Sequence, residues 1–117
     1  MTIKEETSAQ RVPNRLDALL NARSVAVVGA SADPRKISGR PIAYMQARGY
    51  KGQIYPVNPG RDHVQGLRCY PSIGAIGQPV DLAIVGTAAN LVEGAIRDGI
   101  AAGVKAFVVF SSGFAEL

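Results

Sequence analysis

The amino-acid sequence predicts an α/β domain built on a doubly wound parallel sheet of about five strands, with helices on both faces. Short aliphatic and β-branched runs alternate along the chain with amphipathic helical segments. The strand-like runs are apolar throughout, which is typical of parallel strands that are buried on both faces. Glycine or proline ends most segments, as expected where strands turn into helices. This alternation implies right-handed crossovers whose helices cover both faces of the sheet.

The chain has 117 residues, which is enough for one domain. Apolar residues make up 47% of the sequence and charged residues 19%, with 13 glycines and 7 prolines, a composition typical of a globular protein with many tight turns. Residues 1–12 are polar and are expected to form a mobile tail. We therefore expect one folded domain over residues 13–117.

The first half of the chain predicts a helix, a strand, a second helix and a second strand. Leu16, Leu19 and Leu20 are spaced as in a short amphipathic helix within residues 14–23. The next segments are a strand over "SVAVV" (24–28), a helix over "GRPIAYMQARG" (39–49) with proline in its first turn, and a strand over "GQIYPVNP" (52–59).

The second half predicts three strands, a helical turn and one long helix. A short strand is expected around "GLRCY" (66–70), a helical turn after Pro71, and a buried strand over "VDLAIVG" (80–86). In the helix over 88–103, Val92, Ile96 and Ile100 repeat every four residues. A last strand spans "VKAFVVF" (104–110), after which a doubly wound sheet normally continues into another helix. We therefore expect the chain to be part of a longer one.

Nothing in the sequence indicates a membrane or a secreted protein. The apolar runs are too short to span a bilayer, and the first residues, "MTIKEETSAQR", carry acids and lack the apolar core of a signal peptide. The single cysteine, Cys69, cannot form an internal disulfide, and it is interpreted as a small, partly buried thiol. A cytoplasmic location is expected.

Positive charge is concentrated in the segment from Arg35 to Arg68. This segment has seven basic residues against one acidic residue, a net charge of +6 in a chain whose net charge is +4. It favours a small, strongly anionic ligand or a nucleic acid, and the alternative is a solvated basic face. No recognition-helix pattern or aromatic stacking platform is evident, so we expect no nucleic-acid partner.

In a sheet of this kind the ligand lies at the carboxyl ends of the strands. The segments expected to line that crevice are 28–36, 57–61, 86–90 and 111–114. Gly29 permits close approach of the backbone, and Ser31 offers a hydroxyl and backbone N–H groups to a phosphate. The alternative is a turn that needs small residues for packing alone.

A nicotinamide dinucleotide fits this sequence poorly. The first turn lacks the second and third glycines of G-x-G-x-x-G, and the second strand ends without the acid that would bind a ribose 2′-hydroxyl. Arg61 follows instead, and its guanidinium suits a phosphorylated ribose, in NADP or in coenzyme A (CoA). The alternative for Arg61 is an exposed loop charge. An NADP-binding domain remains a remote alternative function.

Four segments resemble one protein family in order and spacing. They are "RSVAVVGASADPRKISGRP", "GYKGQIYPVNPGRDHVQGLRCYPSI", "VDLAIVGTAANLV" and "GVKAFVVFSSGFAE". Together they resemble the N-terminal, Rossmann-like CoA-binding domain of ADP-forming (NDP-forming) acyl-CoA synthetases, relatives of the succinyl-CoA synthetase alpha subunit. The resemblance covers about residues 16–117.

The resemblance implies a set of CoA-binding residues. It places Val28, Gly29, Ala30 and Ser31 on the CoA phosphates, Arg61 where the succinyl enzyme has a lysine, and Ser111, Ser112 and Gly113 beside the thiol-bearing arm. Val57, Asn58, Thr87 and Ala88 would flank the adenosine. Ala88 departs from the family pattern, which often has proline there, and this predicts a looser turn.

Such enzymes convert acid, ATP and CoA into acyl-CoA, ADP and phosphate, through an acyl phosphate and a phosphohistidine. The resemblance assigns the phosphohistidine and an ATP-grasp module, with ATP and Mg²⁺, to other domains or a partner subunit. His63, the only histidine, is interpreted as a loop residue outside the phosphorylated position, and no catalytic triad or metal-spaced cluster occurs. We therefore expect this chain to bind CoA or acyl-CoA without catalysing.

Two alternatives share the CoA site: a stand-alone CoA-binding protein, and the CoA-binding part of a protein acetyltransferase fusion. The sequence after Leu117 would distinguish them, since a ligase needs the histidine and the ATP-grasp region. Apolar surface near the last strand also predicts self-association into a homo-oligomer, which gel filtration would detect.

Overall fold

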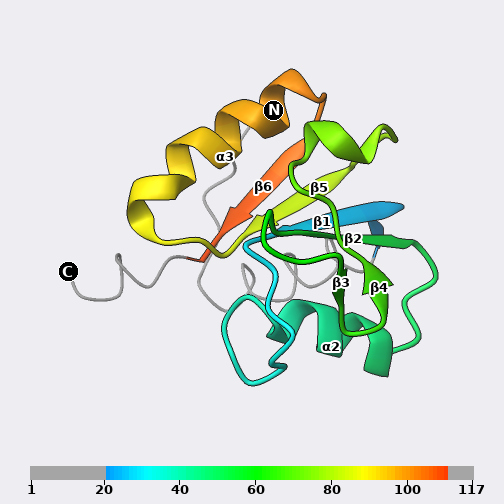
Figure 1. Ribbon diagram of the computed structural model, residues 1–117. Helices are drawn as coiled ribbons and strands as arrows, with labels where there is room; N and C mark the ends of the chain where they lie inside the picture. Colours follow the sequence, from blue (N-terminus) through cyan, green and yellow to red (C-terminus); the bar gives the residue numbers. More distant parts are fainter. Residues whose placement is uncertain (1–20, 111–117) are drawn as a thin grey trace, which may run out of the picture.

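The computed structural model describes residues 21–110 of the chain (Figure 1). The helices and strands, in chain order, are β1 (Ser24–Val28), α2 (Arg40–Ala47), β2 (Gln53–Val57), β3 (His63–Val64), β4 (Leu67–Arg68), the 3₁₀ helix η1 (Gly74–Ile76), β5 (Leu82–Val85), α3 (Ala89–Ala101) and β6 (Ala106–Val109). The expected tail over residues 1–12 and most of the expected helix over 14–23 lie outside the described residues. So do Ser111, Ser112 and Gly113.

The main sheet has four parallel strands in the order β2-β1-β5-β6. The chain passes from β1 through α2 to β2 at one edge, then crosses to the other side of β1 to form β5. The order therefore reverses beside β1, which is where a doubly wound sheet opens a crevice. Val28 pairs with Val57 on one side and with Val85 on the other, so three strands end level and their turns meet at one edge.

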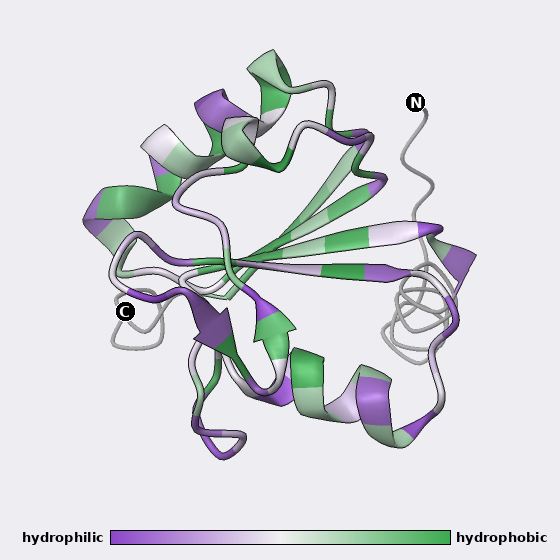
Figure 2. Cartoon of the chain, turned by 45° about the vertical axis from the view of Figure 1, so that its right-hand side comes forward, coloured by the Kyte–Doolittle hydropathy of each residue, from purple (hydrophilic) through white to green (hydrophobic). Residues whose placement is uncertain are grey.

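Helices cover both faces of this sheet, as the sequence predicts (Figure 1). Successive residues of β1 point to opposite faces because the side chains of a strand alternate. Val25 and Val27 pack with Ile42 and Met45 of α2. The residues that face the other way pack with Val92 of α3 and with the region around η1. Figure 2 shows the result, with apolar strands in the middle and the hydrophilic bands of both helices turned outward.

The buried face of α3 differs from the predicted repeat of Val92, Ile96 and Ile100. Val92 is buried and Ile96 packs partly against the core, but Ile100 is 64% exposed. A repeat of exactly four residues drifts around a helix of 3.6 residues per turn, so its third member leaves the buried face. Gly99 takes that place, and an added Cβ there would lie 2.5 Å from the Phe107 ring.

The strand expected around residues 66–70 forms, but outside the main sheet. Leu67–Arg68 pairs antiparallel with His63–Val64 in a hairpin. Parallel pairing needs a crossover of a dozen or more residues. The interval between Val57 and Leu67 is shorter than that, so Leu67–Arg68 pairs with the preceding short strand, and Tyr70 beyond it forms a single parallel bridge to Val57. Within residues 21–110, no helix is long and apolar enough to cross a membrane.

Candidate functional site

A cavity of about 530 Å³ opens at the carboxyl ends of β1, β2 and β5, on the face that α3 covers. Its floor is the sheet edge, and its walls are α3 on one side and the segment after β4 on the other. Six of the predicted site residues line it, namely Val28, Gly29, Val57, Asn58, Thr87 and Ala88. The cavity thus lies at three of the four turns that the sequence predicts, and the fourth, 111–114, lies outside the described residues.

Gly29 brings the turn after β1 into direct contact with the turn after β5. Its φ of +80° is one that a residue with a side chain rarely adopts. A Cβ at Gly29 would also lie 3.0 Å from the Gly86 carbonyl oxygen and 3.0 Å from Thr87 Cγ2. The glycine is thus needed both for the turn and for the close approach of the two strands that frame the cavity.

The backbone N–H groups at this turn are already in use. Gly29 and Ala30 donate to the Val57 carbonyl, at 2.8 and 3.1 Å. Ala30 is fully buried on the α2 side, away from the cavity. A phosphate here would therefore have to be bound by groups later in the loop than the N–H groups of Gly29 and Ala30.

Ser31 lies just beyond, where it shapes the loop. Its hydroxyl oxygen accepts a hydrogen bond from the Asp33 N–H at 3.0 Å, which leaves the hydroxyl proton available to a ligand. Asp33 in turn forms an ion pair with Arg35, with Nε 3.1 Å from Oδ1, and this contact lowers the pKa of the Asp33 carboxyl. The exposed cations of this loop, Arg35 and Lys36, lie after the carboxyl end of β1.

Asn58 serves mainly as a brace between the turns after β1 and β2. Its Nδ2 donates to the Ala30 carbonyl at 3.0 Å, and its Oδ1 accepts from the Gly60 N–H at 2.9 Å. The same turn ends at Arg61, whose N–H donates to the Asn58 carbonyl at 3.3 Å. Arg61 is exposed and lies beside the cavity, outside its lining.

Thr87, at the start of the turn after β5, belongs to the lining of the cavity. Its Oγ1 is buried and has no hydrogen-bond partner among the described residues. A buried hydroxyl without a partner is costly, and Thr87 belongs to the lining of the cavity, so a ligand that came within reach of this atom would relieve that cost. The next residue, Ala88, has φ of −59°, which is the value that proline would impose. The turn therefore keeps the proline-like shape without the proline.

The side walls of the cavity were not predicted from the sequence. They are formed by Pro71, Ser72 and Ile73 on one side and by Leu91, Gly94, Ala95 and Asp98 of α3 on the other. A glycine inside a helix costs about 1 kcal/mol relative to alanine, so Gly94 could have indicated that this face of the helix leaves room for another group. At Gly94 an added Cβ would meet nothing within 4 Å, which leaves the space beside it open.

Cys69 is buried behind the turn after β2, as the sequence predicts for a partly buried thiol. Burial raises the pKa of its thiol, and this effect outweighs the backbone hydrogen bonds at Asn58 and Tyr70, which lower it. A thiol held protonated in this way is a poor nucleophile. His63 is exposed and lies at the start of β3 rather than in a loop. Among residues 21–110, no group of His, Cys, Asp or Glu side chains could hold a metal ion.

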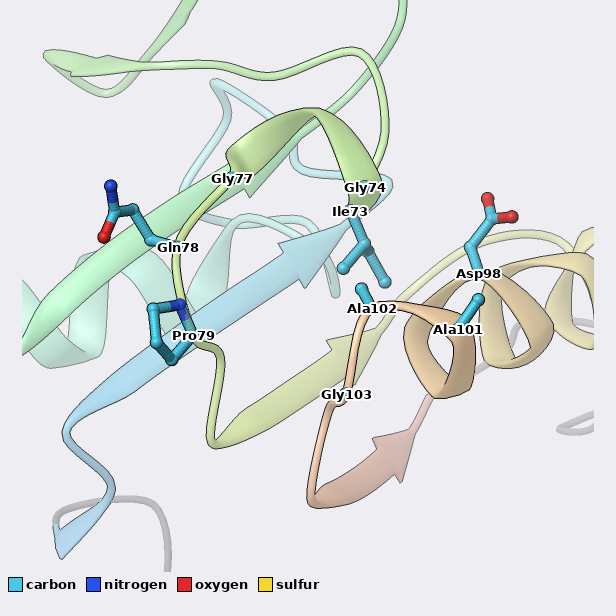
Figure 3. A pocket seen from close by; sticks show the side chains of 9 residues that line it. All are labelled: Ile73, Gly74, Gly77, Gln78, Pro79, Asp98, Ala101, Ala102 and Gly103. Carbon is cyan, nitrogen blue, oxygen red and sulfur yellow. The ribbon is translucent and has the colours of Figure 1, made fainter.

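A second cavity, of about 600 Å³, lies at the opposite edge of the sheet (Figure 3). Its lining includes Pro79, which precedes β5, and Gly103, which precedes β6. It therefore lies at the amino ends of these strands, away from the Gly29 turn and from the cations of the loop that follows β1. Ile73 and Asp98 contribute to both cavities. The geometry favours the first cavity as the ligand site.

Comparison with known proteins shows which family this chain resembles. A family model described as "CoA binding domain" matches residues 23–116. The chain is 39% identical over 105 residues to an ADP-forming acetate–CoA ligase II of Archaeoglobus fulgidus, covering 90% of this chain and 16% of the ligase. It is 40% identical over 106 residues to the alpha subunit of ADP-forming acetate–CoA ligase I of Pyrococcus furiosus, covering 87% of this chain and 23% of that subunit.

Solved structures give the same picture. The apo form of a dinucleotide-forming acetyl-coenzyme A synthetase 1 from Ca. Korarchaeum cryptofilum matches with a TM-score of 0.77 and 42% identity, over 86% of this chain and 22% of that one. A hypothetical protein from Pyrococcus horikoshii OT3 matches with a TM-score of 0.73 and 21% identity, over 99% of this chain and 96% of that one, which shows a shared fold.

The chain spans about a sixth to a quarter of the curated relatives described above. The family model, in contrast, matches nearly all of this chain, including every described strand of the sheet. The resemblance inferred from the four sequence segments and the Rossmann-like fold are both confirmed. The chain belongs to the CoA-binding domain family, and within it resembles the CoA-binding part of ADP-forming acetate–CoA ligases.

Proposed function

We propose that this chain binds CoA in the cavity at the carboxyl ends of β1, β2 and β5, as the CoA-binding module of an ADP-forming acid–CoA ligase. The observation that carries the proposal is the cavity itself, which opens beside β1 at the switch point of the sheet and is lined by the Gly29 turn and by Thr87. Its relatives support the reaction class, because two of them are ADP-forming acetate–CoA ligases.

The cavity fits part of CoA rather than all of it. Its volume of about 530 Å³ and its small-residue wall on α3 suit a flat, compact group such as an adenosine. The exposed cations after β1 and β2, Lys36 and Arg61 among them, lie at the same edge and suit the phosphates. Ser111, Ser112 and Gly113, which follow β6, would then accompany the thiol-bearing arm.

In the whole ligase, acid, ATP and CoA would give acyl-CoA, ADP and phosphate. The described residues offer no group suited to phosphoryl transfer: His63 is exposed on the hairpin, and no metal-binding cluster is present in residues 21–110. We assign to this chain the binding and orientation of CoA. The phosphohistidine, ATP and Mg²⁺ are assigned to further domains or a partner subunit.

The test is isothermal titration of the chain with CoA, dephospho-CoA and NADPH at one salt concentration. We expect CoA to bind most tightly, because Arg61 can donate to its 3′-phosphate. Arg61→Ala should weaken CoA binding by about 1–3 kcal/mol and leave dephospho-CoA binding nearly unchanged. Arg48→Ala is the matched control, since it removes the same charge after α2, at the opposite edge of the sheet.

The outcomes separate the competing functions. Equal losses for CoA and dephospho-CoA would remove the role of Arg61 but keep the CoA site. Saturable binding of NADPH alone would overturn the proposal and favour the NADP-binding alternative. A stand-alone CoA-binding protein or an acetyltransferase part would show the same binding, and only an acid-, ATP- and CoA-dependent release of ADP by the whole protein would exclude them.

A further inference from the structure

The hairpin formed by β3 and β4 reaches across to the loop that follows β1. Gln65 lies at the hairpin tip, and its carboxamide nitrogen donates to the carbonyls of Ser31 and Gly39, both at 3.0 Å. Gln65 is also the one residue other than glycine with positive φ, +50°, in residues 21–110. Glycine or asparagine tolerates that conformation better, so the two hydrogen bonds of the glutamine side chain account for a glutamine at this position.

The two carbonyls that Gln65 joins belong to opposite arms of one loop, residues 31–39. The arms touch, since a Cβ at Gly39 would lie 2.0 Å from the Asp33 carbonyl oxygen. Between the ends of the arms the backbone supplies a single long hydrogen bond, from the Ser31 N–H to the Ser38 carbonyl at 3.4 Å. Gln65 therefore provides the two shorter links that close this loop.

The hairpin is itself fixed to the turn after β2. The Cys69 N–H donates to the Asp62 carbonyl at 2.7 Å, and the Asn58 N–H donates to the Tyr70 carbonyl at 2.8 Å. Gln46 of α2 adds a contact from its side-chain nitrogen to the Gln65 carbonyl at 3.2 Å. The hairpin thus connects the loop that carries Arg35 and Lys36 to the turn that carries Arg61.

We propose that Gln65 is a positioning residue for the anionic part of the ligand. It touches no part of the cavity; it closes loop 31–39 and holds the cations of that loop in register with Arg61. The inference rests on the proposed function, since it takes CoA as the ligand whose phosphates meet these cations. If the loop is already closed, ligand binding does not include the free-energy cost of ordering it, so the apparent affinity is higher.

Gln65→Asn is the informative variant. Asparagine keeps the carboxamide and accepts the positive φ, but its side chain is one methylene too short to reach both carbonyls. We expect CoA to bind about five- to thirtyfold more weakly, the equivalent of one to two hydrogen bonds. Trypsin should also cleave faster after Arg35 and Lys36, because the opened loop fits a protease more readily.

Gln46→Ala is the matched control. It removes one hydrogen bond to the same hairpin residue and leaves the loop closed, so its affinity for CoA should stay within about twofold of the original. A thermal denaturation of each variant shows whether any loss of affinity follows a general loss of stability. A loss in Gln65→Asn that exceeds the one in Gln46→Ala at equal melting temperature supports the proposal.

Gln65→Glu adds a readout that general destabilisation does not produce. A carboxylate cannot donate to either carbonyl, but the protonated carboxyl can donate to one. The affinity of this variant, relative to that of the original chain at the same pH, should therefore recover as the pH falls through the carboxyl pKa. A ratio that is constant with pH would contradict the role of the donor.

Equal affinity and equal cleavage rates for Gln65→Asn and the original chain would overturn the inference. If the original chain fails to bind CoA, the proposed function falls together with the ligand named here. The cleavage rates then still decide whether Gln65 closes the loop, because trypsin reports on loop 31–39 without any ligand.

Discussion

At the scale of single residues, the site is defined by atoms that the fold leaves incomplete. Thr87 Oγ1 is buried without a partner among the described residues, while the Asn58 carboxamide next to it is engaged at both ends. Asn58 therefore holds the turns together, whereas Thr87 lines the cavity with a hydroxyl that has no partner among the described residues. The sequence predicted both positions as site residues but could not assign these roles, because each role depends on a contact distant in the chain.

Thr87→Val separates recognition from stability. The change removes the unpartnered hydroxyl and keeps the shape of the side chain, so the free energy of unfolding without ligand should stay equal or rise. CoA binding should weaken by about 1–2 kcal/mol, because the hydrogen bond to the ligand is lost. Chemical denaturation and isothermal titration measure the two quantities.

Thr87→Ser is its control, since it keeps the hydroxyl and should retain more of the affinity than valine does. If Thr87→Val loses stability and binds CoA as tightly as the original chain, the hydroxyl has a structural role and the assignment is wrong.

At the scale of elements, the sequence predicted most of the architecture. The continuous apolar run of β1, the proline in the first turn of α2 and the amphipathic pattern of α3 are local signals, and each appears where it was expected. The hairpin of β3 and β4 was not predicted, and only a strand around residues 66–70 was expected, because two-residue strands carry too little pattern to show their partner. The small-residue face of α3 was overlooked, because the apolar repeat alone was taken to define how the helix packs.

One acidic residue ties three strands together at their amino ends. Asp81 precedes β5, accepts a hydrogen bond from the Arg23 N–H at 2.9 Å just before β1, and lies 3.4 Å from Lys105 Nζ just before β6. The Arg23 N–H, and then Lys105, lower the pKa of the Asp81 carboxyl. Since the pKa is lower in the folded chain, the contribution is present at neutral pH and is lost as the pH falls through that pKa.

Asp81→Asn should therefore lower stability at neutral pH and make it less sensitive to acid. Urea denaturation between neutral pH and about pH 3 measures both effects. Lys105→Ala should retain most of the acid sensitivity, because the backbone N–H of Arg23 makes the larger contribution. An acid profile for Asp81→Asn that parallels the original would contradict this account.

At the scale of the whole molecule, the two edges of the sheet are built for different tasks. The amino edge is fastened by Asp81 and its partners, whereas the carboxyl edge gathers glycine turns, exposed cations and an unpartnered hydroxyl around a cavity. Of the seven basic residues between Arg35 and Arg68, Arg35, Lys36 and Arg61 lie on the loops that follow β1 and β2, whereas Arg48 and Lys51 follow α2 at the opposite edge. The predicted self-association, in contrast, stays a prediction.

The central claim, that CoA binds at the carboxyl edge, is tested most directly by titrating the ¹⁵N-labelled chain with CoA and following the backbone amide signals. We predict that the largest shifts fall on Gly29, Asn58, Thr87 and the residues from Ser111 to Gly113. Gly77 and Gly103, which line the cavity at the opposite edge, should change little. Shifts centred on Gly77 and Gly103, with Gly29 and Thr87 unchanged, would contradict the account and move the site to the amino ends of the strands.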